Sequence, residues 1–169
     1  VAESCEYTNS FLRFAPTVSV ILNVEEDHLD FFKDINDIIH SFHEFAELTP
    51  MNGLVVVNHD DQNAMRAVAH IDRRIRTFGT TSDADVYPTE VRDENGYYRF
   101  TVNIDGKEYA KVALSVPGRH NMLNALACCA AAEFLGVPGE AAEKGLNKFT
   151  GSSRRFQLVG KMPNGATVV

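Results

Sequence analysis

The chain has 169 residues, 44% hydrophobic and 23% charged, which is enough for one globular domain with a substantial core. Its 16 basic and 23 acidic side chains give a formal net charge of −7. The sequence has no block of basic residues, which argues against a surface that binds nucleic acid through its phosphates. No apolar run reaches membrane-spanning length, and three cysteines without framework spacing indicate reduced thiols, so we expect a cytoplasmic protein with no membrane insertion.

Residues 1–12 carry the first candidate ligands, and we expect this segment to be the end of a strand followed by a loop. Its acids Glu3 and Glu6 could hold a hard cation, because carboxylate oxygens suit Mg²⁺. Two acids in such a segment are more often simply solvated, so the residues alone leave both interpretations open.

Residues 16–30 are the strongest local signal in the chain. The apolar run 18–22 is typical of a strand buried on both faces of a parallel sheet. Asn23 ends the run, and a polar cluster follows it: Glu25, Glu26, Asp27, His28 and Asp30. Ligands of open α/β sheets bind at the carboxyl ends of such strands, where Asn23 could reach a ligand and Asp27 could orient the His28 ring. The alternative is that these acids solvate a loop and cap the next helix.

The following segments alternate between helix and strand patterns. Apolar side chains at three- and four-residue steps predict an amphipathic helix over residues 31–48. A second buried strand is expected at 54–57, and the polar residues 58–61 after it could cap a helix over 62–69. A third strand is expected at 73–78. This order is typical of a parallel sheet with helical crossovers.

The period changes between residues 85 and 116, where apolar and polar side chains alternate. The joints Asn95-Gly96 and Asp105-Gly106 are strong hairpin signals, because both turn residues must take positive φ. Three antiparallel strands are expected, at residues 86–92, 97–103 and 107–115. The predicted fold class is therefore α/β, with a mostly parallel sheet flanked by helices and an added antiparallel β-meander.

The second chemical motif, residues 117–127, predicts the start of a helix. Asn121 and Asn124 lie three residues apart on one helix face, and amide side chains suit an adenine edge. The alternative is that Asn121 caps the helix. Cys128 and Cys129 continue the apolar run, so we expect both in the core, and a further helix is expected at 140–149.

Four motifs resemble those of the Mur ligases, ATP-dependent enzymes that build the peptide of the bacterial cell wall. Residues 23–30 are similar to the signature TN-x-x-x-DH-[LM]-D, with Leu22 in place of the usual Thr. Residues 3–12 match part of the pattern E-x-D-E-S-D-x-S-F-L, found in the branch that adds L-alanine. The segment from Gly118 matches the adenine-binding pattern G-x-H-N-x-x-N-x-x-A, and residues 151–156 resemble the hinge pattern G-x-x-R-R-F.

This resemblance implies ATP and Mg²⁺ (or Mn²⁺) as cofactors. It implies that Glu6, with Glu3 as the fallback, holds the metal of the nucleotide, and that His28 helps to hold a second metal near an acyl phosphate. In residues 3–12, Cys5, Tyr7 and Thr8 depart from the family pattern. The remaining implied contacts are His120, Asn121 and Asn124 to the nucleotide, Ser10 and Asn23 to the substrate, and Arg154 or Arg155 to phosphate.

The resemblance also implies a domain division and a reaction. Residues 1–150 would be part of the central ATP-binding domain, with its first strand and P-loop lying upstream, and residues 151–169 the hinge and first hairpin of the C-terminal domain. The implied reaction ligates L-alanine to UDP-N-acetylmuramate through an acyl phosphate, in peptidoglycan precursor synthesis, and this chain alone would be inactive. The alternatives are a nucleotide-binding relative acting in a protein complex and a ligase that reattaches recycled murein peptides.

Overall fold

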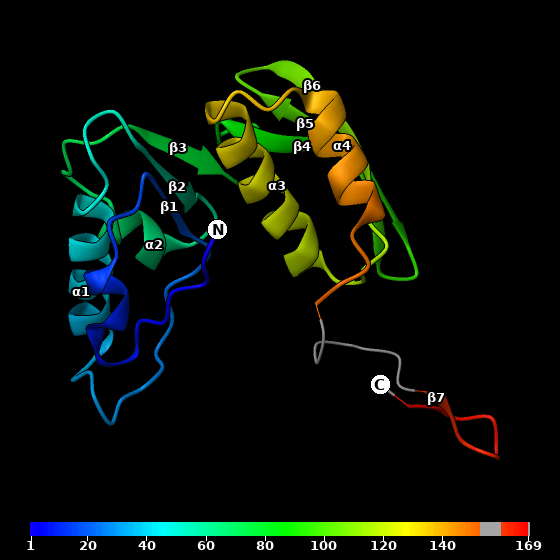
Figure 1. Ribbon diagram of the computed structural model, residues 1–169, viewed down its shortest axis with the longest axis horizontal. Coiled ribbons are helices and arrows are strands. Elements are labelled where there is room, and N and C mark those ends of the chain that lie inside the picture. Colours follow the sequence, from blue (N-terminus) through cyan, green and yellow to red (C-terminus); the bar gives the residue numbers. More distant parts are fainter. Residues whose placement is uncertain (153–159, 169) are drawn as a thin grey trace.

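The computed structural model describes residues 1–152 and 160–168, and shows a six-stranded sheet with helices on both faces (Figure 1). The strands lie side by side in chain order, and the first four run parallel. They are β1 (Val18–Ile21), β2 (Leu54–Asn58), β3 (Ile75–Phe78), β4 (Val86–Glu94), β5 (Tyr97–Ile104) and β6 (Lys107–Ala113). Because β5 and β6 pair antiparallel with their neighbours, the predicted parallel sheet with an added meander is confirmed.

Strand β2 lies between two hydrophobic cores, and all of its residues are buried. Val55 and Val57 face the core formed with α1 (Ile35–Glu47) and α2 (Gln62–Ala67). Its alternate residues, Leu54 and Val56, face the core formed with α3 (Arg119–Phe134), α4 (Gly139–Lys148) and the meander. An apolar run buried on both faces is what a strand between two helical layers requires. The same burial was predicted for residues 18–22, and this is wrong for Val20 and Leu22, which are exposed. The strand β1 lies at one edge of the sheet, so its second face is less covered than that of β2.

The meander turns at the two predicted joints. Asn95 and Gly96 have φ of 58° and 87°, and Asp105 and Gly106 have φ of 51° and 77°. Both turns therefore use the left-handed backbone that Asn-Gly and Asp-Gly adopt readily. The edge strand β6 is covered by α4, whose Glu143 Oε2 accepts from the Lys111 amide at 3.0 Å.

Several predicted boundaries are wrong by a few residues. Residues 7–13 form a 3-10 helix, η1 (Tyr7–Arg13), where a strand end and loop were expected, and Phe11 on it stacks on Phe45 of α1 at 4.8 Å between ring centroids. Helix α1 begins at Ile35 and not at residue 31, because the Asp34 side chain caps it by accepting from the amides of Asn36 and Asp37.

The prediction that both neighbouring cysteines lie in the core is wrong for one of them. Cys129 is buried and Cys128 is exposed. Successive residues of an α-helix point about 100° apart, so only one of the pair can face the sheet directly. Burial raises the pKa of the Cys129 thiol to about 12.

The end of the chain forms a short hairpin, β7 (Gly160–Lys161) with β8 (Thr167–Val168), joined through the predicted turn at residues 163–165. The strand expected at 156–159 lies outside the described residues, and the domain division at residue 151 stays a prediction. Within the described part of the chain, no helix is both long and apolar enough to cross a bilayer.

Candidate functional site

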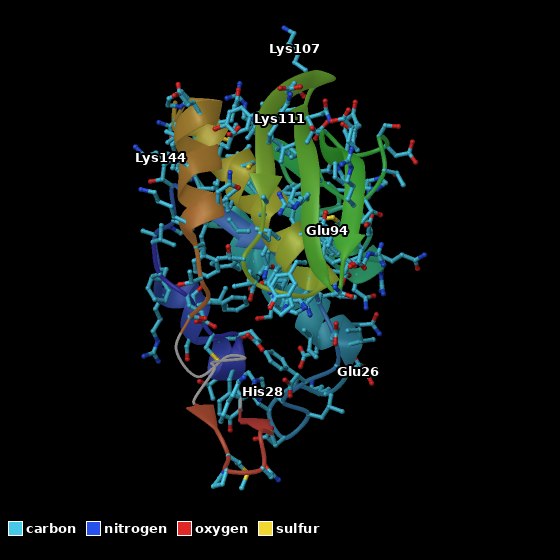
Figure 2. All side chains as sticks on the ribbon, turned by 90° about the vertical axis from the view of Figure 1, so that its right-hand side faces the viewer. Glu26, His28, Glu94, Lys107, Lys111 and Lys144 are labelled. Carbon is cyan, nitrogen blue, oxygen red and sulfur yellow. The ribbon has the colours of Figure 1, made fainter. Side chains whose placement is uncertain are left out.

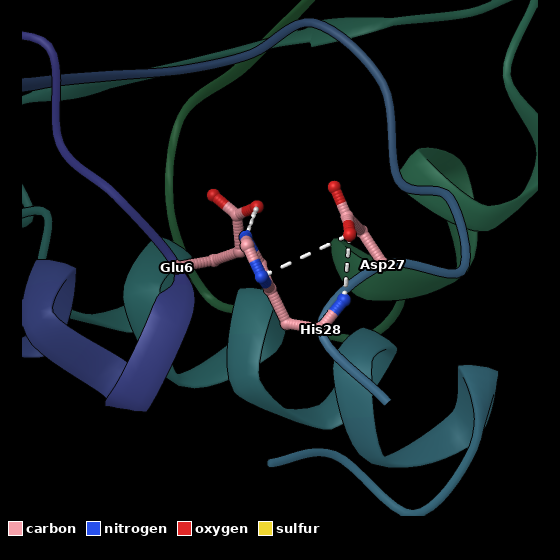
Figure 3. Close-up of side chains that lie close together, drawn as sticks. All are labelled: Glu6, Asp27 and His28. Atoms are coloured by element: carbon pink, nitrogen blue, oxygen red, sulfur yellow. Dashed lines mark hydrogen bonds and ion pairs between the residues drawn. The ribbon is translucent and has the colours of Figure 1, made fainter. Parts of the chain in front are cut away.

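Two segments that are distant in the sequence bring a histidine and two acids together beyond the carboxyl end of β1 (Figure 3). Glu6 lies at the start of η1, and Asp27 and His28 lie in the loop after β1. His28 Nε2 is 3.5 Å from Glu6 Oε1, and His28 Nδ1 is 3.8 Å from Asp27 Oδ1. One ligand atom from each of the three residues lies within 4.8 Å of the others.

The loop that carries His28 is anchored at both ends. Val24 is buried, its amide donates to Asp61 Oδ2 at 3.2 Å, and its carbonyl accepts from Asn63 at 3.1 Å. Farther along, Phe32 is also buried, and its amide donates to the His28 carbonyl at 2.9 Å. The sequence therefore fixes a polar loop by placing apolar side chains on each side of it.

The backbone of His28 is left-handed, with φ of 53°, and Asp27 Oδ1 accepts its amide hydrogen at 2.7 Å. Asp27 was predicted to orient the His28 ring, yet its hydrogen bond goes to the His28 backbone. The ring itself lies against Tyr7, with 4.6 Å between centroids. The Tyr7 hydroxyl donates a hydrogen bond to Asp30, and this bond raises the pKa of the phenol.

The donor set of this cluster fits a divalent cation. Carboxylate oxygens suit Mg²⁺ and Mn²⁺, whereas imidazole suits the later transition metals better. The side chains of His28 and Glu6 are 32% and 30% exposed, so water or phosphate oxygens can reach the remaining coordination positions. The family resemblance implied that Glu6 and His28 hold two different metal ions, but their side chains lie close enough to share one ion. Glu3 is exposed and is not part of this group of three.

Asn23 and Ser10, the two predicted substrate contacts, make hydrogen bonds to neighbouring residues of their own segments. Asn23 is exposed and donates to Glu25 Oε1 at 3.1 Å. Ser10 Oγ donates to the Tyr7 carbonyl at 2.8 Å, within η1. Neither side chain belongs to the group of Glu6, Asp27 and His28.

The carboxyl ends of β2 and β3 join the start of α3 through a polar network. Asp60 Oδ2 accepts from the amide and the hydroxyl of Thr80 at 3.0 and 2.8 Å, and Arg119 Nη2 donates to the same hydroxyl at 3.5 Å. Asp61 caps α2 by accepting from the Ala64 amide, as predicted. Arg119 was not among the predicted site residues, although it lies in the first turn of the helix that carries the adenine-binding pattern.

Asn121 and Asn124, near the start of α3, lie in different environments. Gly118, the N-cap residue, has φ of 106° and offers no capping side chain. Asn121 Nδ2 donates to the Pro117 carbonyl at 2.7 Å, so its amide stabilises the turn before the helix. Asn124 and His120 are exposed, and their side chains are available to a ligand. Arg154 and Arg155 lie outside the described residues.

Comparison with known proteins agrees with these motifs. The profile of the Mur ligase middle domain matches residues 3–132. The UDP-N-acetylmuramate–L-alanine ligase of Agathobacter rectalis is 46% identical over 170 residues, covering 100% of this chain and 37% of that protein. The chain thus spans little more than a third of the length of the curated relatives it matches.

Solved structures show the same fold. UDP-N-acetylmuramate:L-alanyl-gamma-D-glutamyl-meso-diaminopimelate ligase from Neisseria meningitides has a TM-score of 0.74 at 31% identity, covering 86% of this chain and 44% of that one. UDP-N-acetylmuramate-alanine ligase MurC from Thermotoga maritima has a TM-score of 0.75 at 27% identity, covering 92% of this chain and 34% of that one. The resemblance in the motifs is confirmed, and the chain belongs to the Mur ligase family.

Proposed function

We propose that the protein containing this chain is an ATP-dependent ligase that joins L-alanine to UDP-N-acetylmuramate, in the cytoplasmic synthesis of peptidoglycan precursors. The observation that carries this proposal is the group of Glu6, Asp27 and His28 beyond the carboxyl end of β1, in a Mur ligase middle domain. The substrates follow from the names of the relatives, one of them 46% identical to this chain.

The reaction has two steps. The carboxylate of UDP-N-acetylmuramate attacks the γ-phosphorus of ATP, which forms an acyl phosphate and releases ADP. The amine of L-alanine then attacks the acyl carbon, and the tetrahedral intermediate collapses to the amide and inorganic phosphate. Both steps bring negative oxygens together, so the site must supply positive charge where that charge develops.

Glu6, Asp27 and His28 would hold a divalent cation, which supplies that charge when bound. His120 and Asn124, at the exposed start of α3, would contact the adenine, and Asn121 would hold the turn in place. Asn23 and Ser10 would contact the substrate after leaving their local hydrogen bonds, and Arg154 or Arg155 would contact phosphate. Glu3 remains the second candidate for the nucleotide metal.

A recycling ligase is the second candidate function, because the Neisseria protein named for a tripeptide substrate is 31% identical to this chain. A direct test supplies the intact protein with ATP, Mg²⁺ and UDP-N-acetylmuramate, and then with either L-alanine or L-alanyl-γ-D-glutamyl-meso-diaminopimelate. We expect ADP release and an amide product with L-alanine. Product with the tripeptide alone would favour the recycling ligase, and nucleotide binding without product from either would favour a binding protein.

A further inference from the structure

The ring of Tyr7 covers one face of the His28 imidazole. Their centroids are 4.6 Å apart, within the range of interacting aromatic pairs, and their planes are tilted by 34°. Tyr7 directly follows Glu6 in the chain, and Glu6 Oε1 is 3.5 Å from His28 Nε2. The same short segment therefore supplies both an acid at one ring nitrogen and an aromatic face beneath the ring.

Tyr7 is itself held by the loop that carries His28. Its hydroxyl donates to Asp30 Oδ2 at 2.8 Å, and its ring makes a T-shaped contact with the Phe31 ring, with 6.1 Å between centroids. Phe31 in turn packs against Phe32, which is buried in the core beside α1 and α2. The position of the Tyr7 ring is thus linked to the core and not only to its own segment.

We propose that Tyr7, fixed by Asp30, is a positioning residue that holds the His28 imidazole with Nε2 directed at Glu6, ready for a divalent cation. The inference rests on the proposed metal role of this cluster and goes beyond it, since Tyr7 stands where the family pattern has Ser. Neither Tyr7 nor Asp30 is assigned as a metal ligand.

The physical reason is preorganisation. The His28 side chain is about one third exposed, so an unsupported ring would rotate freely and would have to be ordered when a metal binds. The Tyr7 ring and the Tyr7–Asp30 hydrogen bond supply that order in advance. Loss of the groups that orient a metal ligand typically weakens metal binding by roughly 10- to 100-fold.

The test measures the affinity of the intact protein for Mn²⁺ alone, from the electron paramagnetic resonance signal of the free ion. We expect Tyr7→Ala to weaken binding by roughly tenfold, and Tyr7→Phe, which keeps the ring and loses only the hydroxyl, by roughly threefold. Phe14→Ala is the matched control, because Phe14 is an exposed aromatic residue at the end of η1. Tyr7→Leu replaces Tyr7→Ala if the alanine variant has a lower melting temperature.

A double-mutant cycle separates positioning from general packing. If Tyr7 acts through His28, Tyr7→Ala should change Mn²⁺ affinity by less than about twofold in a His28→Ala background. Unchanged affinity in Tyr7→Ala, or an equal loss in both backgrounds, would overturn the inference while leaving the metal site intact. The proposed metal site itself fails if His28→Ala and Glu6→Gln both bind Mn²⁺ as the unmodified protein does.

Discussion

At the scale of single residues, Asn121 and Asn124 illustrate how one motif can contain a structural and a ligand-facing side chain. The Asn121 amide is already bound to the Pro117 carbonyl, whereas Asn124 is exposed one helical turn later. Substitution of Asn121 would therefore alter the fold of the turn as well as any ligand contact. Asn124 gives the cleaner test of adenine recognition.

We predict that Asn124→Ala in the intact protein raises the dissociation constant for ATP by roughly five- to a hundredfold. Losing one hydrogen bond and leaving its partner unsatisfied costs about 1–3 kcal/mol, and 1.4 kcal/mol is about tenfold in affinity. Inorganic triphosphate has no base, so its affinity should fall less. Calorimetric titration with both ligands checks this, and equal weakening of the two would contradict adenine recognition by Asn124.

His28 provides a second prediction at this scale. His28→Ala in the intact protein should reduce ligase turnover far more than it reduces the melting temperature, because the ring is partly exposed and contributes little to the core. His40→Ala is the control, since His40 is an exposed histidine on α1 paired with Glu44 at 3.9 Å. Steady-state rates at saturating substrates decide the matter, and normal turnover of His28→Ala would exclude a metal role for this residue.

At the scale of elements, α4 covers the edge of the sheet that β6 forms. The β6 amides of Lys111 and Ala113 donate to Glu143 and Asn147, which lie one turn apart on α4. Exposed edges invite pairing with other chains, and covering the edge with polar side chains prevents it. The close approach is visible at Gly139, where an added Cβ would lie 1.7 Å from the Tyr109 carbonyl oxygen.

We predict that Asn147→Ala lowers the free energy of unfolding by about 1 kcal/mol, because the Ala113 amide loses its acceptor at 2.7 Å. Lys144→Ala, at an exposed position of the same helix (Figure 2), should change it by less than about 0.5 kcal/mol. Urea unfolding of the two variants gives the comparison. Equal stability of both would show that the α4 hydrogen bond is replaced by water at no cost.

The burial of Cys129 on α3 and of Tyr109 on β6 also predicts how stability depends on pH. Burial raises the pKa of the Cys129 thiol from its ordinary value of 9.0 to about 12, and that of the Tyr109 phenol from 10.0 to about 12. Above about pH 9 the unfolded chain releases protons that the folded chain keeps, so the free energy of unfolding should fall between about pH 9 and pH 12. In urea unfolding at several alkaline pH values, Cys129→Ala should show a shallower fall than Cys5→Ala, and equal slopes would contradict burial as the cause.

At the scale of the whole molecule, local patterns predicted the layers of the fold but not the contacts between distant segments. The β2 run and the two meander turns were predictable, because burial on both faces and positive φ act on neighbouring residues. The 3-10 helix η1 was not, since its place depends on Phe11 stacking on Phe45. For the same reason the spacing of residues 6 and 28 did not indicate that their side chains meet, and the family resemblance assigned them to different metals.

The last prediction concerns the 169-residue chain by itself. It contains no glycine-rich phosphate loop followed by Lys and Ser or Thr, and β1 forms one edge of the sheet in the described structure, with Val20 and Leu22 exposed. Without backbone amides and a lysine to hold the β- and γ-phosphates, the cluster of Glu6, Asp27 and His28 has no correctly placed phosphoryl group to act on. We therefore expect the isolated chain to release no ADP from ATP and Mg²⁺, with or without UDP-N-acetylmuramate and L-alanine.

A coupled assay for ADP checks this, with circular dichroism to confirm folding and the intact protein as the positive control. Steady ADP release by the pure, folded chain would show that phosphoryl transfer needs only residues described above.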